Sequence, residues 1–365
     1  MDDIKISDVI NFLEQFAHPF YQENYDNAGL NVGDADQKLT RGLICLDVTD
    51  SILDEAIATG ANMIVSHHPL IFHPIKQLTG TNRVERLVMK AIEHHICLYA
   101  MHTNLDNIRM GVNQRFADLL ELQDTSILCP ADNQLLKLAV TVPNHYAQIV
   151  RDAIFSAGGG CIGNYDCCSF NQTGFGTFKA GKHTRPFVGK QGEIHREEET
   201  KIEVIFPKYL KNKIIAALKE KHPYEEIAYD LLVLANKNPL AGSGLIGELK
   251  EKMTFENFML FLKEKMQLKC VKCSNVKGKT VKKVAICGGS GAFLIPYAIE
   301  QHADVFVSSE FHHHDFLDNL DRLPIADIGH YESEIQTKML IFEKLNEKFS
   351  NFAVSKQEVN PADYL

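Results

Sequence analysis

Short apolar runs alternate with amphipathic stretches from residue 43 onward. Three apolar runs of strand length are each followed by a stretch whose apolar side chains repeat with helical spacing. We predict strands over residues 43–49, 62–66 and 97–101, and helices over 50–60, 82–96 and 111–122. This alternation is typical of α/β units built around a largely parallel sheet, and it stops at about residue 127.

The same pattern resumes near residue 280. It predicts strands over 281–287, 304–309 and 323–329, a helix over 292–302, and a last helix with Ile335, Met339 and Phe342 on one face. A glycine-rich turn, residues 288–291, separates the first of these strands from its helix. Because the two segments complete one βα pattern only when joined, we predict that residues 1–128 and 240–365 form one domain from two halves.

The middle of the chain, residues 129–239, has a different order of elements. The predicted order is a strand (135–143), a helix (145–158), a strand (201–207), a helix (208–223) and a strand (227–235). Such repetition predicts a small ferredoxin-like α+β layer. Residues 160–200 are rich in Gly, Lys, Thr and His, and we expect an extended hairpin or a loop there. We therefore predict an inserted α+β domain, which a core tolerates when the ends of the insert lie close together.

Composition narrows the class of protein. The formal net charge of −9 over 365 residues would repel nucleic acid and anionic membranes at long range, so we expect neither as a partner. The N-terminus lacks the basic start and apolar run of a signal peptide, and no segment approaches the roughly 20 apolar residues that span a bilayer. The nine cysteines are odd in number and scattered, which favours reduced thiols and a cytoplasmic location.

Metal-binding side chains follow three of the predicted strands at the point where each strand ends. His67 and His68 come directly after strand 62–66, His102 and Asp106 follow strand 97–101, and His330 and Glu334 follow strand 323–329. In parallel α/β sheets, ligands bind at the carboxyl ends of the strands. We therefore expect the three segments to deliver their side chains to one site.

The proposed ligands are His67, His68, Asp106, His330 and Glu334. The adjacent rings of His67 and His68 diverge in a loop, which suits two ions better than one. His330 and Glu334 are four residues apart and share a helical face. Histidine and carboxylate without thiolate favours Zn, Fe or Mn. Three imidazoles and two carboxylates around two divalent ions leave a charge of about +2 for hydroxide or an anionic substrate. The sequence thus predicts two divalent metal ions with open positions.

Other features allow two interpretations each. Glu310, at the end of strand 304–309, is a candidate general base or an outer residue that orients a ligand. The turn in CGGSGAF (287–293) could bind phosphate on its N–H groups, or serve as a tight turn with close backbone approach. The run His312–His314 fits a solvated helix face better than a metal site. The CxxC of Cys270 and Cys273 lacks the second pair of a zinc ribbon.

Several of these segments together resemble a known family. YQENYDNAGLNVGD (21–34), SHHPLIF (66–72), HTNLD (102–106), CGGSGAF and GHYESE are similar to the motifs of the Nif-three-like proteins, also named GTP cyclohydrolase I type 2 homologues. The middle segment, with HPYEEIAYDLL (222–232), resembles the PII-like or CutA-like insert of many bacterial members. The resemblance implies a dinuclear site on the same five residues and a toroidal homohexamer. Tyr25 departs from the family, which often has Trp before Asp-Asn.

The residues and the resemblance lead to one functional hypothesis and one rival. We expect a dinuclear metal-dependent hydrolase in which water activated by the ions attacks an electrophilic carbon or phosphorus of a small, nucleotide-like substrate. The family name suggests GTP ring opening, but no segment indicates guanine recognition. The rival is a metal-dependent binding or regulatory assembly without turnover, in which the insert senses a ligand. Catalytic turnover by the metal-loaded protein would distinguish the two.

Overall fold

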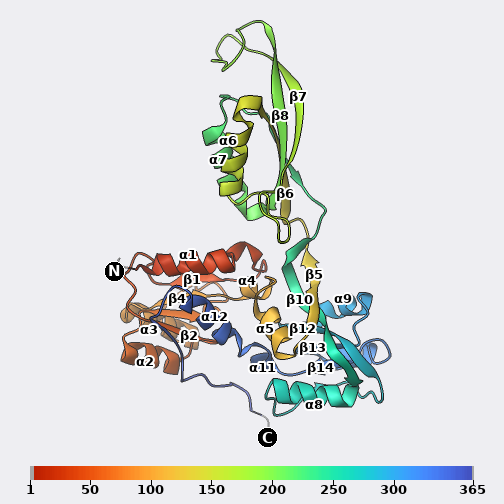
Figure 1. The fold of residues 1–365 in the computed structure, drawn as a ribbon. Coiled ribbons are helices and arrows are strands. Elements are labelled where there is room, and N and C mark those ends of the chain that lie inside the picture. The colour runs from red at the N-terminus through yellow and green to blue at the C-terminus, as the bar shows by residue number, and fades with distance from the viewer. Residues whose placement is uncertain (1–3, 364–365) are drawn as a thin grey trace. The chain divides into compact units, whose positions relative to one another are not determined.

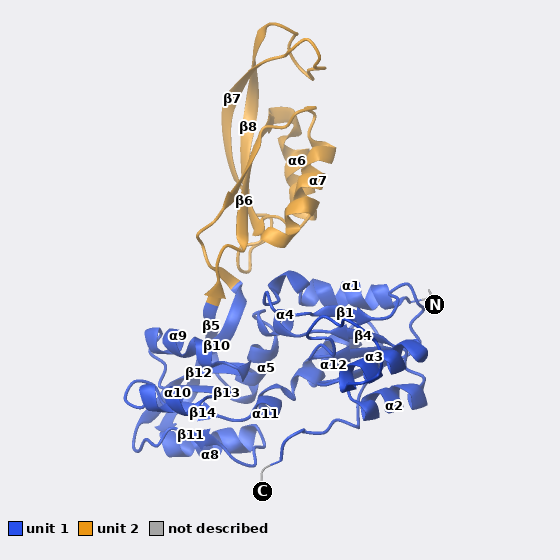
Figure 2. Ribbon diagram, turned by 180° about the vertical axis from the view of Figure 1, so that it is seen from behind, with its two compact units in different colours: residues 1–129, 240–365 blue, residues 130–239 orange. Residues whose placement is uncertain are grey.

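The structure, a computed structural model, describes residues 4–363 and has a mixed α/β fold with three sheets, which confirms the predicted class. The chain forms two compact units (Figure 2). Unit 1 combines the residues up to 129 with those from 240 onward, and unit 2 consists of residues 130–239. Within residues 4–363, no helix has the length and apolar character needed to cross a membrane.

The first sheet of unit 1 is built around three short, fully buried strands. These strands are β2 (Gly42–Cys45), β3 (Met63–Ser66) and β4 (Cys97–Ala100). They run parallel to one another and to β15 (Phe352–Val354), whereas β1 (Gly29–Val32) pairs antiparallel with β4. Helices α2 (Asp50–Thr59) and α3 (Arg83–Glu93) cover one face, and α1 (Ile6–Phe16) and α12 (Thr337–Asn346) cover the other (Figure 1). Coverage on both faces explains why these strands read as continuous apolar runs.

The second sheet of unit 1 draws on both chain segments. Its order is β11-β14-β13-β12-β10-β5, with β12, β13 and β14 parallel. The strands are β5 (Gln123–Ala131), β10 (Asn238–Thr254), β11 (Lys272–Cys273), β12 (Thr280–Ser290), β13 (Val305–Ser309) and β14 (Ile325–Asp327). Helices α5 (Val112–Leu119) and α8 (Phe255–Lys265) pack on one face, and α9 (Ile295–Glu300) packs on the other. β5 and β10, which lead into and out of unit 2, are neighbours in this sheet.

Unit 2 is an antiparallel sheet with two helices on one face. Its strands, in the order β7-β8-β6-β9, are β6 (Leu135–Pro143), β7 (Phe170–Lys179), β8 (Ile194–Pro207) and β9 (Tyr229–Val233). Alternate side chains of β6 and β8 pack against α6 (Ala147–Ser156) and α7 (Lys211–Lys221). This β-α-β-β-α-β order is the ferredoxin-like arrangement. The stretch left open as a hairpin or a loop is a hairpin, in which β8 begins seven residues before its predicted start.

Three predicted details are wrong. The first strand ends at Cys45 rather than at residue 49. Residues 288–290 belong to β12 and form no turn; the pairing with β13 shifts register there, and Gly289 has a φ of +66°. The last helix is divided into α11 (His330–Glu334) and α12. The buried residues of α12 are Thr337, Ile341 and Leu345, and of the three predicted side chains only Phe342 is among those that pack, partly buried, against the core cluster.

Candidate metal centre

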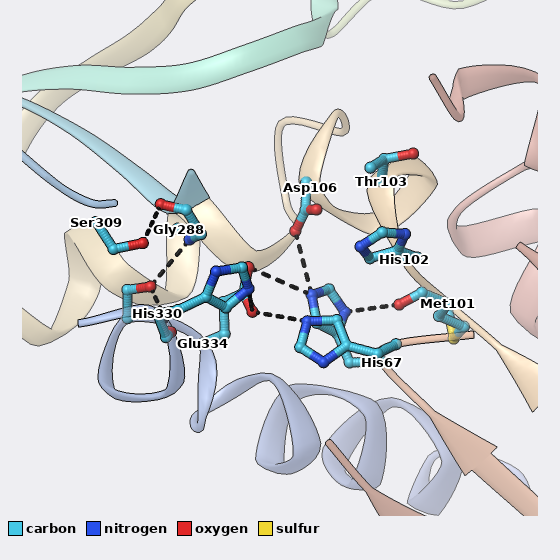
Figure 3. A network of polar contacts seen from close by, with 12 residues as sticks. His67, Met101, His102, Thr103, Asp106, Gly288, Ser309, His330 and Glu334 are labelled. Atoms are coloured by element: carbon cyan, nitrogen blue, oxygen red, sulfur yellow. Dashed lines mark hydrogen bonds and ion pairs between the residues drawn. The ribbon is translucent and has the colours of Figure 1, made fainter. Parts of the chain in front are cut away.

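The five predicted ligands lie around one pocket in unit 1. Its volume is about 500 Å³, and its lining includes His68, Asp106, His330 and Glu334. His67 lies behind His68, fully buried, with 4.9 Å between the ring centroids. The side chains come from the carboxyl end of β3, from the short helix α4 (Thr103–Asp106) after β4, and from α11 after β14 (Figure 3). The strand-end argument therefore locates all five in space.

His67 offers a free ring nitrogen in a buried position. Its Nδ1–H donates to the carbonyl of Met101 over 2.7 Å, so Nε2 carries the lone pair when the ring is neutral. Nε2 has no hydrogen-bond partner among the described residues, and neither has Asp106 Oδ1, although both atoms are buried. Nε2 lies 3.7 Å from Asp106 Oδ1 and 3.7 Å from Glu334 Oε1. Buried polar atoms that lack hydrogen-bond partners and face each other in this way fit the donor set of a cation site.

Glu334 is the centre of the cluster. Its Oε2 lies 3.0 Å from His68 Nε2 and 3.0 Å from His330 Nε2, while its Oε1 faces His67. The two histidines on Oε2 come from different chain segments, 262 residues apart by number. The carboxylate is only 3% exposed. One buried carboxylate thus presents each of its oxygens to a different group of imidazoles.

In the metal-free protein this arrangement shifts several pKa values. Burial lowers the pKa of His68, but hydrogen bonds to Asp47 and Glu334 outweigh burial and raise it to about 10. Burial also lowers the pKa of His330, and its contact with Glu334 raises it to about 9. Burial, followed by the negative charge of Glu334, raises the pKa of Asp106. Both His68 and His330 therefore carry protons in the place where a metal ion would bind.

The cluster fits a metal ion on its donor chemistry and spacing. One ligand atom each from His67, His68 and Glu334 lie within 4.8 Å of one another. The neighbouring donor pairs are separated by 3.0–3.7 Å. Tetrahedral ligands with bonds of about 2.0–2.1 Å lie about 3.3 Å apart. These residues could therefore hold an ion.

A second layer of acceptors fixes the ring orientations. His68 Nδ1 donates to Asp47 over 2.9 Å, and His330 Nδ1 donates to Glu310 over 3.0 Å. His102, whose ring centroid lies 5.4 Å from those of His67 and His68, donates from Nδ1 to Asp26 over 2.6 Å. In each case the acceptor binds the N–H at Nδ1, so Nε2 is the ring nitrogen that could bind a metal ion. Such partners orient metal-binding imidazoles.

Gly288 and Gly289 bring the β12 backbone against the cluster. A Cβ at Gly289 would overlap Glu334 Oε1, so only glycine fits at this position. The N–H of Gly288 donates to Asn113 Oδ1 and that of Gly289 to Ser333 Oγ, both over 2.9 Å. These N–H groups are therefore not free to bind phosphate. Of the two interpretations of this segment, close backbone approach is the one that the structure supports.

The remaining candidates lie outside the donor set. Glu310 contacts Nδ1 of His330, the side of the ring away from Glu334, which matches an orienting role better than that of a base. His312–His314 are exposed at the start of α10 (His313–Asp318). Cys270 and Cys273 are exposed free thiols.

Sequence reasoning missed Asp47 and Asp26, which orient His68 and His102. Asp47 lies just past the end of β2, so the strand-end rule could have found it. The predicted strand was too long and placed Asp47 inside it. Asp26 precedes β1 in an irregular segment, where nothing but the family motif marks it.

Comparison with known proteins identifies relatives over the whole chain. The model of the Duf34/NIF3 (NGG1p interacting factor 3) family matches residues 4–361. A Halalkalibacterium halodurans protein named "GTP cyclohydrolase 1 type 2 homolog" is 41% identical, covering 92% of this chain and 91% of its own. A Bacillus subtilis protein of the same name is 37% identical and covers 98% of each chain. A solved Bacillus cereus protein related to NIF3 matches with a TM-score of 0.86 at 34% identity, covering 100% of both chains.

Proposed function

Because the chain belongs to the Duf34/NIF3 family and carries this cluster, we propose that it is a dinuclear metal-dependent hydrolase with a small, nucleotide-like substrate. The observation that carries the proposal is that the two carboxylate oxygens of Glu334 face different side chains. Its Oε1 faces His67, which in turn faces Asp106, and its Oε2 faces His68 and His330. The five side chains thus form two groups of three that share one carboxylate.

Each group would hold one divalent ion. His67, Asp106 and Glu334 Oε1 form the first group, and His68, His330 and Glu334 Oε2 form the second. When bound, divalent ions lower the pKa of a water molecule and polarise a phosphoryl or carbonyl oxygen. Asp47, Glu310 and the Met101 carbonyl keep the imidazoles in their donor orientation. The protein's part in the reaction is therefore to fix the ions in place and to leave one side of them open to the pocket.

His102 is the residue best placed to move a proton. It lines the same pocket, and its Nδ1 is held by Asp26. Its Nε2 is therefore the atom that can exchange a proton with a bound substrate. Imidazole is the side chain that most often transfers protons in active sites.

The pocket rim supports a nucleotide-like substrate. Tyr25, Phe72 and Phe293 line it with side chains that are 65%, 40% and 59% exposed. The rings of Tyr25 and Phe72 lie 6.2 Å apart. Exposed aromatic rings beside a site that attracts anions suit a molecule with a planar base and a phosphate.

The test measures metal content and turnover together. The chain is loaded separately with Zn, Fe or Mn and assayed for product release from nucleotide, phosphoester and amide panels. We expect two ions per chain and turnover of at least one nucleotide. Glu334→Gln should lose at least one ion and reduce turnover at least a hundredfold, because the shared carboxylate loses its charge. Glu332→Gln, a neighbour on α11 whose carboxylate contacts Asn360, should behave like the parent.

A fully loaded parent chain that releases no product from any panel would overturn the hydrolase and leave the rival, a metal-dependent binding protein. Inorganic phosphate would then be the first probe, because an anion trap should bind it in a metal-dependent way. A Glu334→Gln chain that carries as much metal as the parent would overturn the ligand set itself.

Location and assembly complete the proposal. Nine free cysteines support a cytoplasmic protein, since thiols stay reduced there. We also propose a toroidal homohexamer, which light scattering on the purified chain would test.

A further inference from the structure

Unit 2 contains a second pocket, on the sheet face opposite its two helices. Its volume is about 570 Å³, and it lies among β7, β8, the residues that follow β7, and the segment around Tyr224. Alternate residues of the β7-β8 hairpin face it, namely Gly174, Gly176 and Phe178 on β7 and Glu199 on β8. The pocket lies entirely within unit 2, so it belongs to a different compact unit from the metal centre.

Two glycines form the floor of this pocket. Gly176 comes so close to Glu199 that a Cβ there would overlap Oε2, and at Gly174 the space is open. The paired register sets Gly174 opposite Glu199. Glycine at these positions lets the Glu199 carboxylate lie across the neighbouring strand. The floor is thus shaped around a carboxylate.

Glu199 is a buried carboxylate without a cationic partner. The residue is 7% exposed, and the only donor to it among the described residues is the Tyr224 hydroxyl, which reaches Oε1 over 2.9 Å. The nearby Lys201 is paired with Glu203 over 2.8 Å. A buried charge is costly unless it is paired, and a phenol is a neutral donor. Glu199 Oε2 is therefore available to a positively charged group in the pocket.

Aromatic rings form the walls on either side of Tyr224. Its ring centroid lies 6.2 Å from that of Phe178 and 6.3 Å from that of Phe187. Phe187 is 49% exposed although it carries a large apolar ring. The faces of aromatic rings attract cations, and their area also favours an apolar body. The lining also includes Glu225 and Glu226, whose two negative charges stand against the two positive charges of Lys179 and Lys201, so Glu199 leaves the pocket with an excess of one carboxylate.

We propose that unit 2 binds a small organic cation, an amine or amidine attached to a planar or apolar body, with Glu199 as its counter-ion. The ammonium group takes the free oxygen of Glu199, and the body lies between the rings of Phe178, Phe187 and Tyr224. The glycine floor provides the room. This site is independent of the metal centre and of the hydrolase proposal.

The experiment uses the full chain and three probes that share one ring. Benzylamine, benzyl alcohol and benzoate are titrated with saturation-transfer NMR as the readout. We expect binding of benzylamine at least tenfold tighter than that of benzyl alcohol, and none of benzoate. Glu199→Gln should weaken benzylamine binding at least tenfold, because the amide keeps the shape and removes the charge. Phe187→Ala, on an exposed wall, should weaken it a few-fold.

The matched control is Glu198→Gln. Glu198 directly precedes Glu199 on β8, is exposed, and points to the opposite face of the strand. The Glu198→Gln chain should bind benzylamine with the affinity of the parent. Equal binding of the three probes, or no binding of any, would overturn the proposal. So would a folded Glu199→Gln chain with unchanged affinity, and if that variant fails to fold, unchanged binding by Phe187→Ala decides against the site.

Discussion

The two pockets stabilise buried charge in opposite ways. In unit 1, two carboxylates and three imidazoles surround one another, and the pKa values of His68 and His330 rise to about 10 and 9 because neighbouring carboxylates accept hydrogen bonds from them. In unit 2, a single buried carboxylate faces a neutral phenol and aromatic rings. The first pocket already contains the groups that neutralise it. The second lacks one, and so points to a ligand that brings its own positive charge.

The difference also lies in where the side chains come from. The metal cluster collects residues from strand ends and short helices, so it depends on the register of two sheets. The unit 2 pocket lies on the face of one hairpin, and its carboxylate and floor are fixed by one strand pair. If this contrast is sound, each pocket can be disturbed without the other.

Deleting unit 2 should have the largest effect, because it removes one pocket completely and leaves the metal site in place. Residues 130–239 are replaced by a short Gly-Ser linker, which β5 and β10 accept because they are neighbours in one sheet. We expect the remaining chain to fold, to keep the metal content of the parent, and to lose the benzylamine signal completely. Elemental analysis and the NMR titration measure the two outcomes. A folded product that carries no metal would show that the pockets depend on each other.

The pH dependence of metal affinity should be the next largest effect. Because His68 and His330 have raised pKa values in the metal-free protein, protons compete with metal up to about pH 9–10, rather than only below the ordinary value of about 6.5. Affinity should rise about tenfold per pH unit for each proton released, so between pH 6.5 and 8.5 it should rise about a hundredfold if one histidine loses its proton and about ten-thousandfold if both do. Competition against a chelator measures it. An affinity that is level above pH 7 would contradict this account.

Gly289→Ala should have the smallest effect of the three predictions. We expect the variant to bind metal at least tenfold more weakly than the parent. The added Cβ overlaps Glu334 Oε1, so the carboxylate must move although no ligand is removed. Gly278→Ala is the control, since that glycine has a similar φ of +68° but open space around its Cβ position. Both variants bear a similar backbone cost of about 1–2 kcal/mol. Equal metal affinity in the two would show that Glu334 tolerates the shift.

Much of the fold was predictable from periodicity, and the site from topology. The buried strands β3 and β4 are almost entirely apolar, and polar residues begin at Ser66 in the first and at His102 after the second, so their ends were visible in the sequence to within a residue or two. Because the carboxyl ends of parallel strands share one edge, His67 and Asp106 could be placed together before any coordinates.

The finer contacts were not predictable. Asp47 was hidden because Val48 follows it and continues the apolar run, although the backbone leaves the sheet at Cys45. Gly289 looked like a turn because a glycine pair has no side chain to show whether it bends the chain or admits a neighbour. Glu199 stood in a charged run, REEETK, that reads as a solvated face. Its position between β6 and β7 and the approach of Tyr224 bury it.

The burial of His67 and Glu334 bears on how quickly a bound ion could leave. The two residues are 0% and 3% exposed, and Met101 holds the His67 ring in place, so neither can swing into solvent to release an ion. Departure would have to break several bonds one after another within the folded chain. A bound ion should then exchange with ions in solution over a time longer than a purification takes. The ion recovered with the protein would record which metal was available in the cell when the chain folded, more than the site's own order of preference.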